Sequence, residues 1–71
     1  MPQASDRTGR VADYDPTRGW GTVLGDDGER LGFHCTQIAD GSRTIAPGAA
    51  VRYRRVPAHL GRYEAVGVSP V

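Results

Sequence analysis

Glycine and proline interrupt this chain so often that they limit what it can fold into. Ten of its 71 residues are glycine and five are proline. Both residue types end helices and favour turns, and an apolar period of 3.6 residues persists over no useful length. We therefore predict a single all-β domain of short strands joined by tight turns.

The size and composition of the chain restrict its class. Hydrophobic residues make up 38% and charged residues 24%, which is ordinary for a folded domain and too apolar for a disordered tail. A domain this small buries only about 60% of the surface that its unfolded chain exposes, so a large catalytic cleft is not expected. We predict a binding module and not an enzyme, with no catalytic residues, no cofactor and no small-molecule substrate.

Cysteine usage and hydropathy indicate the compartment. Cys35 is the single cysteine, so an internal disulfide is impossible and a reducing cytoplasm is expected. No apolar stretch approaches the roughly 20 residues that a membrane span needs, and the first residues lack the apolar segment of a signal peptide. No C-x-x-C motif is present, so no metal site is expected. We predict a cytoplasmic monomer without a membrane partner.

Five stretches have the pattern of strands, and they cover residues 9–15, 20–25, 30–35, 50–56 and 62–69. Residues 1–7 are polar and without a period, so we predict a flexible N-terminal segment before a domain at residues 8–70. Pro16 and Gly19 predict a turn after the first stretch, and Asp27-Gly28 is a strong hairpin signal. Residues 36–38 are expected to form one helical turn.

Alternate residues of a strand point to opposite faces, which sorts the side chains. Those predicted to face the interior are Val23, Leu31, Phe33, Val51 and Tyr53. Those predicted on the outer face of the second and third strands are Trp20, Thr22, Gly32 and His34. Arg52 and Arg54 are expected to point outward, whereas Arg55 occupies a position where alternation requires an apolar residue. This predicts a bulge or a strand end near Pro57.

Five short strands leave exposed edges, and closing the sheet into a barrel removes them. The economical architecture is therefore a small five-stranded antiparallel barrel of the oligonucleotide/oligosaccharide-binding type, the OB-fold. An SH3-like barrel has a similar length and strand number and remains an alternative on composition alone.

Specific residues in order go beyond a generic barrel. They include Gly9-x-Val11-x-x-Tyr14, Arg18-Gly19-Trp20-Gly21-Thr22-Val23, Leu31-Gly32-Phe33-His34, Gly48-x-x-Val51-x-Tyr53 and Ala65-Val66-x-Val68. Over residues 8–70 this pattern resembles a cold-shock domain. The resemblance implies a five-stranded antiparallel barrel that binds single-stranded RNA or DNA, without strong sequence preference, on an aromatic platform of the second and third strands.

Both motifs of that platform depart from the family pattern. The usual first motif, Lys-Gly-Phe-Gly-Phe-Ile, is Arg18-Gly19-Trp20-Gly21-Thr22-Val23 here, so one ring is enlarged and the other is replaced by threonine. The usual second motif, Val-Phe-Val-His-Phe, is Leu31-Gly32-Phe33-His34-Cys35, which keeps only the histidine on the outer face. The usual Trp-Phe pair of the first strand is Asp13-Tyr14, and the loop aromatic is Ser42.

The resemblance therefore implies a reduced binding face. The side chains expected to stack on bases are Trp20, His34 and Tyr14, and those expected to contact phosphates are Arg18, Arg43, Arg10 and Arg30. Gly32 is expected to open a slot in which a base meets the backbone. Asp13 places a negative charge beside the expected phosphate path.

Two functions follow from this reduced face. The first is low-specificity binding of single-stranded RNA or DNA, with RNA chaperoning as its implied consequence. The missing rings motivate the second, in which the barrel is a protein-interaction module that uses Arg52, Arg54 and Arg55. A Cys–His nucleophilic site is not expected, because His34 and Cys35 are neighbours that a strand would point to opposite faces.

Overall fold

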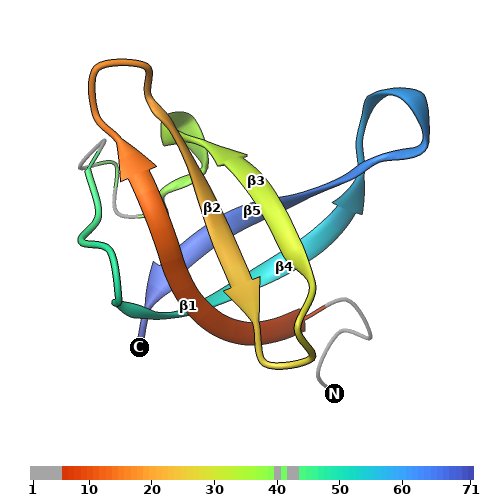
Figure 1. The fold of residues 1–71 in the computed structure, drawn as a ribbon, viewed down its shortest axis with the longest axis horizontal. Coiled ribbons are helices and arrows are strands. Elements are labelled where there is room, and N and C mark those ends of the chain that lie inside the picture. Colours follow the sequence, from red (N-terminus) through yellow and green to blue (C-terminus); the bar gives the residue numbers. More distant parts are fainter. Residues whose placement is uncertain (1–5, 40, 42–43) are drawn as a thin grey trace.

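Five strands close into a barrel in the computed structural model, which describes residues 6–39, 41 and 44–71. They are β1 (Asp6–Asp15), β2 (Trp20–Gly25), β3 (Arg30–His34), β4 (Ala50–Pro57) and β5 (Tyr63–Pro70). Their order around the barrel is β1-β2-β3-β5-β4. Figure 1 shows β2 and β3 in front and β4 and β5 crossing behind, with the curved β1 paired to both layers. The predicted five-stranded all-β barrel is confirmed.

One pair of neighbouring strands is parallel, so the sheet is mixed. β3 pairs with β5 in parallel at Gly32 and Glu64, and a second parallel bridge joins Ile38 to Val68. All other neighbouring strands are antiparallel, as we predicted for the whole barrel. The exception is geometrical: directions cannot alternate around a closed ring with an odd number of strands, so at least one pair must run the same way.

The barrel interior is filled by alternate apolar side chains of the strands, with contributions from two connecting segments. The buried set is Val11, Val23, Leu31, Phe33, Ile38, Ile45, Val51, Tyr53, Ala65 and Val68. Every residue that alternation placed inside belongs to this set, so the predicted register of the second, third and fourth strands is confirmed.

The strand ends differ from the prediction mainly at the N-terminal side. β1 begins at Asp6 because residues 6–8 continue the ladder with β4, and residues 6 and 7 of the predicted flexible segment are therefore strand. Residues 1–5 of that segment lie outside the described residues. Two three-residue 3₁₀ helices, η1 (Cys35–Gln37) and η2 (His59–Gly61), lie between strands. In the described part of the chain, no helix has the length and apolar character needed to cross a membrane.

Two register shifts bend the strands. In β1, Val11 pairs with Val23 and Asp13 with Thr22, so Ala12 is an extra residue. The second shift lies in β5 opposite Arg52 and Arg54, where Gly67 has a φ of 60° that favours glycine. Of the two predicted alternatives near Pro57, the strand end is the one observed: β4 ends at Pro57, and Arg55 remains in the ladder.

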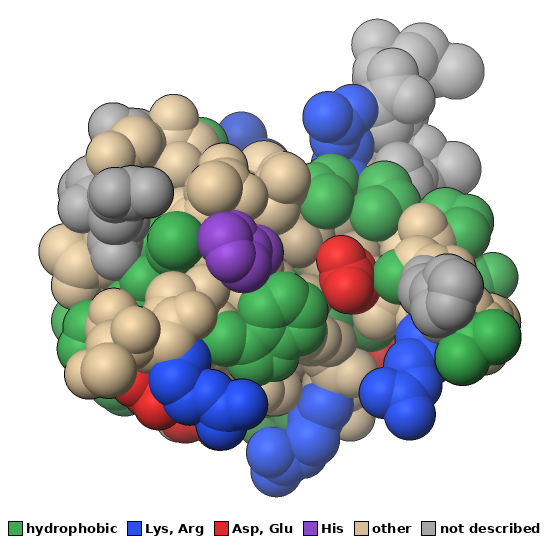
Figure 2. Space-filling model, turned by 90° about the horizontal axis from the view of Figure 1, so that it is seen from above, with side chains coloured by type: hydrophobic (Ala, Val, Ile, Leu, Met, Phe, Trp, Pro, Cys, Tyr) green, Lys and Arg blue, Asp and Glu red, His purple; other side chains and the backbone are tan. Residues whose placement is uncertain are grey.

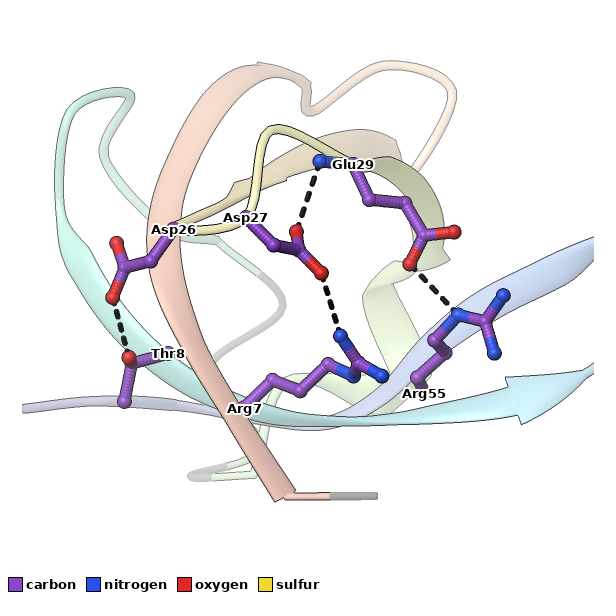
Figure 3. Close-up of polar contacts among 6 residues, drawn as sticks. All are labelled: Arg7, Thr8, Asp26, Asp27, Glu29 and Arg55. Atoms are coloured by element: carbon purple, nitrogen blue, oxygen red, sulfur yellow. Dashed lines mark hydrogen bonds and ion pairs between the residues drawn. The ribbon is translucent and has the colours of Figure 1, made fainter. Parts of the chain in front are cut away.

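Polar side chains fasten the β2–β3 hairpin to β1 at one end of the barrel (Figure 3). The guanidinium of Arg7 pairs with Asp27 at 2.6 Å, and the hydroxyl of Thr8 donates to Asp26 at 2.5 Å. The Asp27 carboxylate also accepts the backbone N–H of Glu29 at 2.9 Å, which closes the hairpin turn. The predicted Asp-Gly hairpin is therefore both a turn and a connection to the first strand.

Candidate functional site

Trp20 and His34 form the centre of the outer face of β2 and β3. They are directly paired across the two strands, and 41% of the Trp20 side chain is exposed. Their rings meet edge to face, with centroids 6.1 Å apart and planes at 64°. Figure 2 shows a histidine side chain lying against a broad hydrophobic surface, with arginine side chains along its edge. Alternation had placed both residues on this face, and the structure agrees.

The indole of Trp20 lies across Gly32. A Cβ atom added to Gly32 would stand 2.6 Å from Cζ2 of Trp20, closer than carbon atoms approach one another. The two residues are diagonal neighbours on one face of an antiparallel pair, where a ring can cover a glycine of the adjacent strand. The slot expected over Gly32 is therefore filled by the indole, and no second ring fits at this position without displacing the first.

The imidazole of His34 is fixed by the chain that follows it. Its Nδ1 accepts the backbone N–H of Thr36 at 3.3 Å and lies 3.0 Å from the Thr36 hydroxyl, so His34 caps η1. Because Nδ1 accepts a hydrogen bond, the proton of the neutral ring is on Nε2. The ring that meets Trp20 is thus oriented before any ligand arrives.

His34 and Cys35 lie closer together than strand alternation predicted. The Sγ of Cys35 is 3.8 Å from Nδ1 of His34, because β3 ends at His34 and Cys35 already belongs to η1. The same Nδ1 is engaged by Thr36, and the Cys35 side chain packs against the core. Among the described residues, no group of three His, Cys, Asp or Glu side chains is arranged to hold a metal ion.

Tyr14 lies on the other side of the sheet from Trp20. It pairs with Gly21, so the two share a face, and the Tyr14 ring stacks on buried Phe33 with centroids 5.9 Å apart and planes at 10°. The extra residue at Ala12 shifts the alternation and brings Asp13 opposite Thr22 on the outer face. The structure thus does not bring Tyr14 together with the other two predicted stacking residues.

The four arginines predicted to contact phosphates are distributed differently from the expectation. Arg30 lies on the Trp20 face beside Gly32, and Arg18 is exposed in the turn that leads into Trp20. Arg10 instead directs a guanidinium nitrogen to the backbone carbonyl of Gly48, 3.2 Å away. Arg43 lies outside the described residues.

A groove of about 720 Å³ extends from the indole to the β4–β5 connection. Its floor is the outer face of β2 and β3, and its opposite wall comes from residues that sequence analysis did not select. The lining residues are Trp20, Thr22, Arg30, Gly32, Ala58, Leu60, Arg62, Tyr63 and Glu64. Within the described part of the chain, neither Arg30 nor Arg62 makes an ion pair.

Tyr63 and Leu60 were missed for identifiable reasons. Tyr63 is two residues before buried Ala65, so alternation gave no reason to select it for the outer face, but it is the first residue of β5 and 40% of it is exposed. Leu60 lies in a loop with φ 59° and ψ 42°, a conformation that non-glycine residues adopt rarely, and 84% of it is exposed. An aromatic residue two positions after the loop that contains Pro57 and Gly61 was the available signal for Tyr63.

The β1 side of this face is acidic. Asp13 is paired with Thr22 and Asp15 with Trp20, so both carboxylates belong to the outer face next to the platform. Asp15 accepts the backbone N–H groups of Thr17 and Arg18 at 3.0 and 3.2 Å, which orders the turn. The groove on the β5 side of Trp20 is therefore lined by the cations Arg30 and Arg62 and by the carboxylate Glu64, whereas carboxylates border Trp20 and Thr22 on the β1 side.

The basic cluster of β4 is divided. Arg52 and Arg54 are exposed, but Arg55 donates from Nε to a carboxylate oxygen of Glu29 at 2.7 Å (Figure 3). Its guanidinium also lies over the Tyr63 ring, 3.5 Å from the centroid. The three-arginine surface on which a protein-interaction function was based therefore loses one member to interactions within the barrel.

Comparison with known proteins agrees with this architecture. The search of solved structures found 36 matching chains. One of them, drosophila Unr CSD456, superposes with a TM-score of 0.77 at 24% sequence identity, over 93% of this chain and 26% of that one. The chain has a cold-shock-like fold. It spans about a quarter of the length of that Unr chain. No protein-family model and no curated protein matches the sequence.

Proposed function

We propose that this cold-shock-like barrel binds single-stranded RNA or DNA, weakly and with little sequence preference, on the face centred on Trp20 and His34. The observation that carries the proposal is the half-exposed indole, held over Gly32 in a groove whose two arginines make no ion pair with any described residue. A fixed ring beside cationic side chains is what an unpaired base and its phosphate require.

In the proposed mechanism, aromatic rings bind the bases and arginine side chains bind the phosphates. A base is flat with apolar faces, so it stacks on the indole whatever its sequence, and His34 fixes the edge of the ring. Arg30 and Arg62 attract the phosphates into the groove. Asp13 and Asp15 repel phosphates from the β1 side, so the strand is directed toward the β4–β5 connection.

Tryptophan fluorescence provides a direct test, because Trp20 is the single tryptophan of the chain. We expect heptamers of thymidine and of uridine to quench its emission at low salt. A duplex of equal length should compete poorly, because pairing hides the base faces. Absence of quenching at high micromolar oligonucleotide and low salt would refute the proposal.

A matched pair of variants tests the position of the site. Trp20→Leu should weaken binding of a labelled heptamer, followed by fluorescence anisotropy, by about 5- to 150-fold. Leu24→Ala is the control, because Leu24 is 37% exposed on the same strand but lies outside the groove. Equal losses in both variants would show that the binding face lies elsewhere.

The biological consequence that we propose is RNA chaperoning by a cytoplasmic monomer. A protein that binds only unpaired strands lowers the melting temperature of a weak hairpin in proportion to its concentration, by mass action. A fluorophore–quencher hairpin measures this effect. The protein-interaction alternative is less favoured, because Arg55 is engaged by Glu29 and Tyr63.

A further inference from the structure

The far wall of the groove contains a second exposed ring. Tyr63 lines the groove together with Trp20, and 40% of its side chain is exposed. Leu60 lies at the outer edge of the same wall, where its exposed side chain adds apolar surface. A ligand that stacks on Trp20 and continues along the groove therefore meets a second aromatic side chain on β5.

A cationic side chain, that of Arg55, lies against the ring of Tyr63. The guanidinium of Arg55 lies over one face of the ring, 3.5 Å from its centroid, and Arg55 itself does not line the groove. Arg55 is in turn fixed by Glu29, whose carboxylate accepts its Nε–H at 2.7 Å. This hydrogen bond also raises the pKa of Arg55. One face of the ring is thus covered by a fixed cation, while 40% of Tyr63 remains exposed.

We propose that Tyr63 is a second base-stacking residue of this protein and that Arg55, fixed by Glu29, is a positioning residue that holds its ring. The proposal rests on the proposed function. It adds Tyr63 to the residues that contact the strand, and Arg55 and Glu29 as residues that position Tyr63. It assigns a place for a second base at the β5 side of the groove, away from the carboxylates of Asp13 and Asp15.

The arrangement compensates for the reduced platform. Thr22 and Gly32 carry no ring, and the indole already occupies the space above Gly32, so β2 and β3 offer one extended stacking surface. Arg30 and Arg62 line the same groove as Trp20 and Tyr63, so cations for the phosphates of a bound strand share it with both rings. Two rings and two cations in one groove match at least two consecutive nucleotides.

Substitution at Tyr63 separates this inference from the proposed function. Tyr63→Leu should weaken binding of the thymidine heptamer by about 5- to 150-fold, and Tyr63→Phe, which restores a ring, should recover the affinity. If the wild-type chain binds and Trp20→Leu loses affinity while Tyr63→Leu does not, the inference fails and the proposed function stands. If the wild-type chain does not bind, the proposed function itself fails.

Nuclear magnetic resonance tests the same point without a substitution. In protein with labelled tyrosine, the ring signals of Tyr63 should shift upfield when the heptamer is added, since a base stacks on the ring. Those of buried Tyr53 should not move. The spectrum of Tyr63→Phe assigns the signal. A Tyr63 signal that remains unchanged at saturating heptamer would overturn the inference.

The positioning role of Arg55 has its own readout. Arg55→Met should weaken binding in the wild-type background and cost nothing further in Tyr63→Leu, because it acts only through that ring. It should also leave the salt dependence unchanged, whereas Arg62→Met should reduce the slope of log affinity against log salt by about 0.7. Additive losses, or a reduced slope for Arg55→Met, would show that Arg55 contacts phosphate directly.

Discussion

The buried hydroxyl of Tyr53 leads to an unusual prediction for the free energy of unfolding. Tyr53 is the largest of the fully buried side chains, with 1% exposed, and its hydroxyl has no hydrogen-bond partner among the described residues. The hydroxyl packs so closely on Gly25 that a Cβ there would collide with it. A buried tyrosine is normally destabilised by conversion to phenylalanine, because a hydrogen bond is lost. Here we expect the opposite sign for Tyr53→Phe.

The size of the effect follows from two opposing contributions. Relief of a buried, unpaired hydroxyl stabilises the folded state by about 1–3 kcal/mol. The void left by one oxygen atom, at about 24 cal/mol per Å³, costs about 0.3 kcal/mol. The relief is larger, so Tyr53→Phe should stabilise the fold by about 0.7–2.7 kcal/mol. For a domain of this length that corresponds to a rise in Tm of about 3–22 °C.

The effect should grow in alkaline solution. Burial, followed by the negative charge of Asp27, raises the pKa of Tyr53 above the ordinary value of 10.0. Above pH 10 the unfolded chain therefore loses this proton while the folded chain keeps it, and the free energy of unfolding falls as the pH rises. Tyr53→Phe has no proton to keep, so its advantage over the wild type should widen above about pH 10.

Urea unfolding at pH 7 and at several values above pH 10 measures both effects. Tyr63→Phe is the matched control: it removes a hydroxyl from an exposed ring, so it should change stability little and retain the alkaline decline. A Tyr53→Phe variant that is destabilised by 1 kcal/mol or more at pH 7 would refute the reasoning, because it would show that the hydroxyl is paired. So would an advantage that does not change with pH.

Three further predictions concern the binding face. Gly32→Ala should displace the indole of Trp20 from the β3 backbone, because the added methyl group would collide with the ring. Tryptophan emission should then shift to longer wavelength and heptamer affinity should fall about fivefold or more. Unchanged emission would show that the indole does not pack on Gly32. Thr22→Phe adds a ring beside the indole and should tighten binding by about 1–3 kcal/mol in an anisotropy titration; no gain in affinity would show that the bound strand does not cross Thr22. Asp13→Asn should strengthen binding at low salt, with a gain that shrinks as salt screens the carboxylate; a gain independent of salt would argue against a charge effect.

The sequence was sufficient for the barrel and for most of its register. Alternation is local, so it placed Phe33 inside and Trp20 outside correctly, and the turn residues located the β2–β3 hairpin. The parallel β3–β5 pair was not visible in that way, because it follows from closure of the ring and not from any one segment. The early start of β1 likewise depends on a partner strand more than 40 positions along the chain.

The binding face was harder to predict, because single-residue irregularities redirect side chains. The extra residue at Ala12 turns Tyr14 onto Phe33 and leaves Asp13 on the outer face, which no count of alternate positions could show. Tyr63 was assigned to neither face from the sequence, and it lies exposed at the first position of β5. Both differences arise where a regular strand is bent or begins, so they depend on tertiary structure.

The combination of Trp20 and Gly32 explains how this face keeps a stacking surface with fewer rings. In the family pattern that the sequence resembles, each strand supplies its own ring, whereas here the larger ring of β2 covers the bare backbone of β3. The two substitutions are coupled, because a side chain at Gly32 requires the indole to move, and a smaller residue at Trp20 would expose the glycine. A single indole offers fewer stacked bases than two separate rings. The affinity of this barrel for a single strand should therefore depend on the opposite wall of the groove, where the exposed ring of Tyr63 and the charge of Arg62 lie.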